Sequence, residues 1–251
     1  MKLIKLNQIL SSLITIIFIL LIAYFCTQLF LHEQQAVDGG LILSKKIIYP
    51  DNFSPLIDWI LGAWTSTYQL SALLFKLNWS ILNVSKFFIF FIALFYLLGV
   101  MSVTYAFTKS GVIAFFVSII ILIFQKNFGD ADYPALFFTS DTFGSLSLAL
   151  TTCIFGFVFL GYFFWVGFLS IFLICIHPVV GLWTSLIIFL SVIFIKFIVK
   201  EELDIKSLTY GAITGAFVTA VSFFVYLNKN YFPSSNIDFE ALNNYYKYWE
   251  G

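Results

Sequence analysis

Long segments without a charged side chain alternate with short polar ones along this chain. The longest uncharged segment extends from Thr142 through Ile195. A membrane-crossing helix takes roughly 20 residues, so this segment alone can supply two or three of them. Further uncharged segments lie at 9–31, 87–107, 112–125 and 207–228. The pattern predicts an all-α fold, a polytopic transmembrane helical bundle.

We expect about seven spans, with a range of about six to eight, at the length that a bilayer requires. Their expected positions are 9–31, 85–107, 112–125, 143–160, 162–176, 179–199 and 208–227. Gly161 and His177-Pro178 separate the spans 143–160, 162–176 and 179–199, because proline suits the first turn of a helix and disfavours the helical state in the residue before it. Residues 1–227 would form the transmembrane domain, and 228–251 a tail on the outer side. Gly211 and Gly215, with small neighbours, predict close helix packing in the last span.

The segment 56–77 combines apolar positions at helical spacing with a polar cluster at 65–69. This pattern predicts one amphipathic helix that lies in the membrane interface, with nearby tryptophans as anchors. These tryptophans are Trp59, Trp64 and Trp79. The alternative is a full span, which would place the first loop, with Glu33 and Asp38, and the later loop with Asp130 on opposite sides of the membrane.

Lys2 and Lys5 favour a cytoplasmic N-terminus. With that orientation, most of the acidic residues fall on the outer side. They are Glu33, Asp38, Asp51, Asp58, Asp130, Asp132, Asp141, Asp238, Glu240 and Glu250. Acidic residues contribute little to topology, so this distribution concerns the chemistry of the outer face.

The composition narrows the possible partners. The chain is 61% hydrophobic and 10% charged, with a formal net charge of +0 and no basic tract, which argues against nucleic acid and for the lipid bilayer. Every basic residue apart from the histidines is lysine, so a bound phosphate must be held by lysine, backbone N–H groups or a metal. Cys26, Cys153 and Cys175 all fall in apolar segments, and we expect them to be small core residues.

Paired carboxylates form the sharpest local motif. Asp130 and Asp132 are two residues apart, so in an extended loop both can reach one Mg²⁺ or Mn²⁺ ion, which in turn can hold a diphosphate. The alternative is an ordinary solvated turn. This spacing therefore predicts a metal site that remains to be distinguished from a surface loop.

Three further ionisable residues are candidates for catalysis. Glu33 and Asp38 follow the first expected span, where a carboxylate at the membrane surface could act as a base toward an incoming hydroxyl. The alternative is a polar collar at a helix end, and Gly39-Gly40 predicts a turn there. His177 is an ionisable group at the edge of the membrane, and its alternative role is to cap a helix break.

The order of these features resembles the N-terminal half of the large polytopic glycosyltransferases of clan C and their uncharacterised bacterial relatives. The residues that carry the resemblance are Glu33, Asp38, the segment 56–77, Asp130, Asp132, Tyr133-Pro134 and the turn from His177 to Trp183. It implies a multi-pass protein of the bacterial inner membrane whose donor is a polyprenyl-phosphate sugar. It also implies that Glu33 or Asp38 assists transfer on the non-cytoplasmic side, and that Asp130 and Asp132 hold the metal or diphosphate.

This chain departs from the family in two respects. Clan members usually have more spans and a further soluble domain, whereas this sequence ends after a short tail at 236–251. A truncated remnant or a non-catalytic membrane scaffold is therefore the alternative to an enzyme. A lipid flippase or transporter is the third hypothesis, although spans nearly free of charge argue against transport of ions.

Overall fold

The structure is a computed structural model, and it describes residues 2–29, 35–47, 55–124, 144–200 and 202–228. Within these ranges every regular element is a helix, which confirms the predicted all-helical class. The helices are α1 (Lys2–Leu29), α2 (Gln35–Leu43), α3 (Pro55–Gly62), α4 (Ser66–Lys76), α5 (Ile81–Thr108), α6 (Gly111–Phe124), α7 (Gly144–Leu160), α8 (Phe163–Ile176), α9 (Pro178–Phe194), a π-helical turn (Ile195–Val199) and α10 (Ile205–Leu227).

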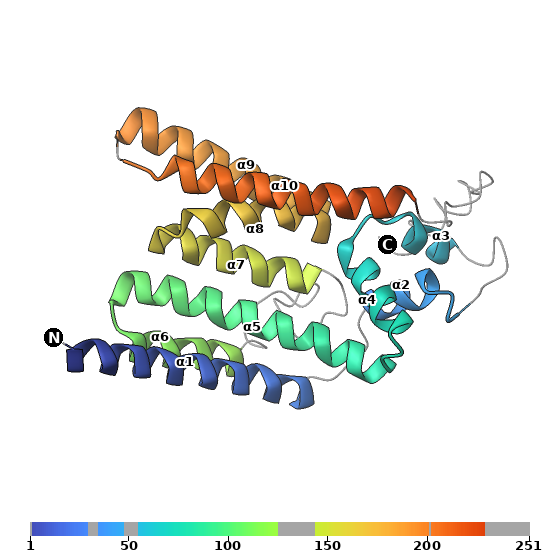
Figure 1. Cartoon of the computed structure of the whole chain (residues 1–251), viewed down its shortest axis with the longest axis horizontal. Coiled ribbons are helices and arrows are strands. Elements are labelled where there is room, and N and C mark those ends of the chain that lie inside the picture. The colour runs from blue at the N-terminus through green and yellow to red at the C-terminus, as the bar shows by residue number, and fades with distance from the viewer. Residues whose placement is uncertain (1, 30–34, 48–54, 125–143, 201, 229–251) are drawn as a thin grey trace.

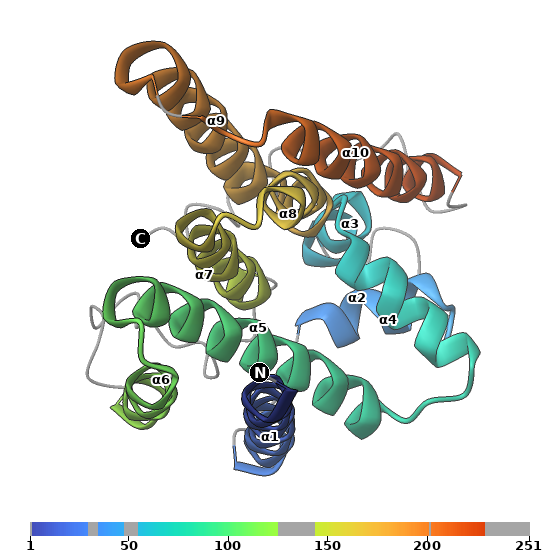
Figure 2. The ribbon, with the colours of Figure 1, turned by 60° about the vertical axis from the view of Figure 1, so that its left-hand side comes forward.

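The longer helices lie side by side, and the short helices α2, α3 and α4 gather at one end of them (Figure 1). We call these three helices the cap, and this end of the bundle the capped end. The last turn of α1, the first turn of α5 and the last turns of α8 and α10 all lie at the capped end. Figure 2 shows α5 between α1 and α6 on one side and α7 on the other, with α8, α9 and α10 beyond α7.

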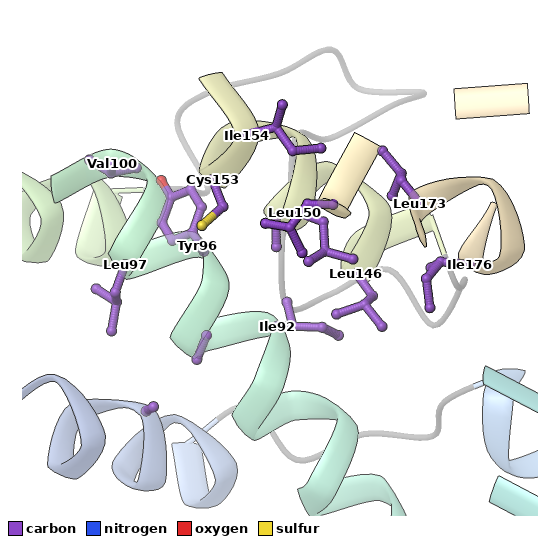
Figure 3. Close-up of a cluster of buried hydrophobic side chains, with 14 of the residues drawn as sticks. Ile92, Tyr96, Leu97, Val100, Leu146, Leu150, Cys153, Ile154, Leu173 and Ile176 are labelled. Atoms are coloured by element: carbon purple, nitrogen blue, oxygen red, sulfur yellow. The ribbon is translucent and has the colours of Figure 1, made fainter. Parts of the chain in front are cut away.

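The main hydrophobic core lies on both sides of α7, where this helix packs against α5 and α8. Ile92 and Tyr96 of α5 are buried with Leu150 and Cys153 of α7 and with Leu173 of α8 (Figure 3). All three cysteines, Cys26, Cys153 and Cys175, are free and buried, which confirms their predicted role as small core residues.

Three of the described helical segments are long and apolar enough to cross a membrane: Ile81–Thr108, Pro178–Val199 and Ile205–Leu227. Shorter apolar helices occupy Thr15–Leu29, Gly111–Phe124, Gly144–Leu160 and Phe163–Ile176. Large apolar side chains project from the outer helices, among them Phe217 of α10, which is 70% exposed. Exposing so much apolar surface to water is unfavourable, so this surface indicates contact with lipid.

The contact between α8 and α10 depends on glycine. A Cβ atom on Gly211 would collide with the carbonyl oxygen of Phe164, and one on Gly167 with the carbonyl oxygen of Leu208. A Cβ on Gly215 would come within 2.5 Å of the carbonyl oxygen of Phe168. The predicted close packing of small residues in the last span is therefore confirmed, and α8 is the partner helix.

The segment 56–77 differs from the expected single helix, because α3 ends at Gly62 and α4 begins at Ser66. Thr65 between them has an extended backbone, with φ of −146°, and its hydroxyl accepts a hydrogen bond from the N–H of Thr67. A threonine in this geometry is an N-cap, which satisfies a backbone donor and starts a new helix. The placement of this segment in the membrane interface stays a prediction.

The turn expected at Gly39-Gly40 was also wrong, because both glycines lie inside α2. A Cβ on Gly39 would collide with the ring of Tyr68, and one on Gly40 with the side chain of Ser71. These glycines therefore allow α2 to pack closely on α4, and their role is helix contact rather than chain reversal.

Candidate functional site at the capped end

Hydrogen bonds from polar side chains fasten the cap to the ends of α8 and α10. The hydroxyl of Thr65 donates to the carbonyl of Ile176, the last residue of α8, at 2.7 Å. The hydroxyl of Tyr226 in α10 donates to the carbonyl of Gly62 at 2.8 Å. Both bonds satisfy carbonyl groups at helix ends, which lack partners within their own helices.

Ser222 of α10 is the centre of a second set of contacts. Its hydroxyl donates to the side-chain carbonyl of Gln69 at 2.9 Å, and the Gln69 amide donates to the backbone carbonyl of Ser222 at 2.9 Å. The indole N–H of Trp64 donates to the Ser222 hydroxyl at 3.2 Å, and its ring packs edge-on against Phe223. Trp64 therefore contacts α10, and its role as a membrane anchor stays a prediction.

Asp38 lies in the first turn of α2 with its side chain exposed, while its neighbours Val37 and Gly39 are buried. The phenol of Tyr68 in α4 is close enough to interact electrostatically with this carboxylate. Burial raises the pKa of Tyr68, and the negative charge of Asp38 raises it further. A carboxylate that is open to solvent, beside a phenol that stays protonated at neutral pH, can accept a proton from an incoming group.

His177 lies between α8 and α9 and caps α9. Its Nδ1 atom accepts a long hydrogen bond of 3.5 Å from the N–H of Val180, and Pro178 occupies the first turn. Burial lowers the pKa of His177 despite a smaller opposing effect of its own backbone, so the imidazole is neutral at pH 7. This geometry matches the capping role that the sequence left open as the alternative to catalysis.

The remaining predicted site residues, Glu33, Asp130 and Asp132, lie outside the described residues. Asp38 and His177 both lie at the capped end, on α2 and at the α8–α9 junction. Among the residues that the structure describes, no three His, Cys, Asp or Glu side chains are grouped so that they could hold a metal ion. The metal site at Asp130 and Asp132 therefore stays a prediction.

Sequence reasoning missed the contacts that hold the cap in place. The polar cluster at 65–69 and Ser222 within an apolar span were visible signals. Their pairing spans more than half of the chain, so local spacing gave no indication of it.

No family model, no curated protein and no solved structure matches this chain. Its helices and their exposed apolar surface define it as an integral membrane protein of the helical class. Any more specific function must therefore be inferred from the capped end itself.

Replacing Thr65 by Val should lower the free energy of unfolding by about 1–3 kcal/mol, the cost of leaving a buried carbonyl without its donor and a helix without its N-cap. Valine keeps the shape of the side chain, so the loss reports the hydroxyl. Denaturant unfolding of the purified protein in detergent micelles measures this change.

Thr152→Val is the matched control, because the Thr152 hydroxyl donates within its own helix, to the carbonyl of Leu148 at 2.9 Å. We expect a change within about 0.5 kcal/mol for this variant, because valine keeps the shape of this half-buried side chain and a hydroxyl bonded back to its own helix adds little stability. Equal losses in the two variants would show that the Thr65 bond does not fasten the cap.

Proposed function

We propose that this chain resembles clan C enzymes in function as well as in layout, and transfers a sugar from a polyprenyl-phosphate carrier at the capped end. The observation that carries this proposal is the exposed carboxylate of Asp38 at that end. In addition, α6 runs back toward the capped end and α7 starts near it (Figure 1), so residues 125–143, which contain Asp130 and Asp132, connect two helix ends that point the same way.

In the proposed reaction, the hydroxyl oxygen of the acceptor attacks C1 of the sugar. The bond from C1 to the phosphate oxygen breaks, and the polyprenyl phosphate leaves with the bonding electrons. The proton of the acceptor hydroxyl passes to Asp38, or to Glu33 if that residue is the base. A divalent ion held by Asp130 and Asp132 would neutralise the charge that develops on the leaving phosphate.

We include in this proposal that the chain crosses the membrane about seven times. Each of the long uncharged segments contains a helix whose length approaches the thickness of a bilayer. The N-terminus would be cytoplasmic, and the capped end would face the non-cytoplasmic side of a bacterial inner membrane. Helices of 14 residues, such as α6 and α8, are about 21 Å long at 1.5 Å per residue. They would cross by thinning the bilayer around them.

Removing both acids of the second loop tests the metal role. The double variant Asp130→Ala with Asp132→Ala should abolish the Mg²⁺-dependent part of the binding of a fluorescent polyprenyl-phosphate hexose, because the ion would lose its carboxylate ligands. Fluorescence anisotropy of the purified protein, with Mg²⁺ and then with a chelator, measures it. Glu202→Ala, which removes an exposed acid between α9 and α10, is the control. Undiminished Mg²⁺-dependent binding in the double variant would eliminate the metal role.

A non-catalytic scaffold is the second candidate. The observation that favours it is that Thr65, Gln69 and Tyr226, polar side chains at the capped end, form contacts within the protein. Binding of the same fluorescent donor without release of polyprenyl phosphate, with every acceptor hydroxyl tried, would favour the scaffold.

A further inference from the structure

A groove of about 580 Å³ lies between α1 and the start of α5, at the capped end. Its α5 wall follows one face of the helix, because Asn83, Lys86, Phe87, Phe90 and Phe91 recur at three- and four-residue spacing. Phe90 lies about 10 Å further along the helix than Asn83, at 1.5 Å per residue. The groove therefore has a polar end at the first turns of α5 and an aromatic wall deeper in the bundle.

Among the lining residues that the structure describes, Lys86 is the charged one, and no carboxylate accompanies it there. Its ammonium group donates to the side-chain carbonyl of Gln28 in α1, at 3.3 Å, which holds the charge at the groove. The side-chain amides of Asn78 and Asn83 add further hydrogen-bond donors beside it. The polar end is thus complementary to a small anion such as a phosphate.

The remaining lining fits a lipid tail. Phe87, Phe90 and Phe91 present an aromatic surface along α5, a helix that is long and apolar enough to cross a membrane. Trp79, which also lines the groove, is 41% exposed. Tryptophan and lysine at the end of a span mark the level of the lipid headgroups.

From this combination we infer that the groove holds an anionic glycerophospholipid of the surrounding bilayer. Its phosphate contacts Lys86 and Asn83, and one acyl chain lies against Phe87, Phe90 and Phe91. Lys86, the one cation among the described residues of the groove, matches the single negative charge of such a phosphate. This site requires no sugar transfer, so it is independent of the proposed function.

Lipid binding to the full chain, delipidated in a neutral detergent, tests the inference. Native mass spectrometry with phosphatidylglycerol should show a bound lipid. The Lys86→Gln variant should bind this lipid about tenfold more weakly, since a hydrogen bond to a charged group typically contributes that factor or more. Lys86→Arg should retain most of the binding. Lys76→Gln is the matched control, because Lys76 is an exposed lysine of the cap outside the groove.

Three comparison ligands identify the source of the phosphate. Diacylglycerol with the same acyl chains should bind at least about tenfold more weakly than phosphatidylglycerol, because it lacks the charged group. Inorganic phosphate should not displace the lipid. Equal binding by Lys86→Gln and the unmodified protein, equal binding of diacylglycerol, or displacement by inorganic phosphate would each overturn the inference. Preferential displacement by a polyprenyl phosphate would also overturn it, and would make the groove a carrier site.

Discussion

Replacing Asp38 by Asn is expected to slow the proposed sugar transfer by about 10²–10⁴-fold, the range by which a positioned general base accelerates a reaction. Asparagine keeps the size of the side chain but cannot take the proton of the acceptor hydroxyl. Because Asp38 is exposed, the substitution should leave the fold intact. The release of polyprenyl phosphate from a radiolabelled polyprenyl-phosphate hexose measures the rate.

Asp58→Asn is the matched control, since it removes the same charge from α3 of the cap at a residue with no proposed role. The loss in Asp38→Asn should appear in kcat, because a general base acts mainly on the transition state. A full rate in Asp38→Asn with a loss in Glu33→Gln would assign the base to Glu33. Full rates in both variants would contradict acid–base assistance by the first loop.

The positions of the long helices could be predicted from the sequence because their signals are local. Each expected span coincides with a described helix, and the predicted breaks are present: α7 ends beside Gly161, and α8 and α9 are separated at His177. Apolar length, proline and glycine act over a few residues, so one sequence suffices to place them. The number of helices that cross a membrane depends on lipid as well, and by length and composition three of the described segments are candidates.

The cap could not be predicted, because its structure depends on partners distant in the sequence. Gly39-Gly40 reads locally as a turn, yet both residues serve the contact of α2 with Tyr68 and Ser71 of α4. From local spacing, the polar cluster at 65–69 would be the solvent-facing side of one helix. In the structure, the side chain of Gln69 instead accepts a hydrogen bond from Ser222, a residue of the last span. A single sequence contains no signal for such pairs.

The candidate site was predicted in part. The sequence singled out Asp38 and His177, and both lie at the capped end, where His177 acts as a helix cap. It gave no indication of the groove at Lys86, because a lysine near the end of a span is an ordinary feature. The asparagines and phenylalanines near Lys86 follow one face of α5, but the groove forms only because α1 packs beside α5 and supplies Tyr24 and Thr27 to its lining.

Replacing Gly211 by Leu should lower the free energy of unfolding by about 3 kcal/mol, the upper part of the range for overpacked sites. A Cβ at this position would collide with the carbonyl oxygen of Phe164 and come within 2.9 Å of the backbone nitrogen of Phe168. Backbone atoms of α8 cannot move aside as a flexible side chain can, so the two helices must separate. Denaturant unfolding of the purified protein in micelles measures the loss.

Gly111→Leu provides the matched control, because a Cβ on Gly111 would meet nothing within 4 Å. Leucine also favours a helix over glycine, so this variant should be unchanged or more stable by up to about 1 kcal/mol. The smaller change Gly211→Ala should fall between Gly211→Leu and the unmodified protein, since its single methyl group meets the same carbonyl. Equal stability of Gly211→Leu and Gly111→Leu would mean that α10 does not rest on α8 at this glycine. In that case the cap, which is bonded to the ends of both helices, would lack the rigid support on which the geometry of the capped end depends.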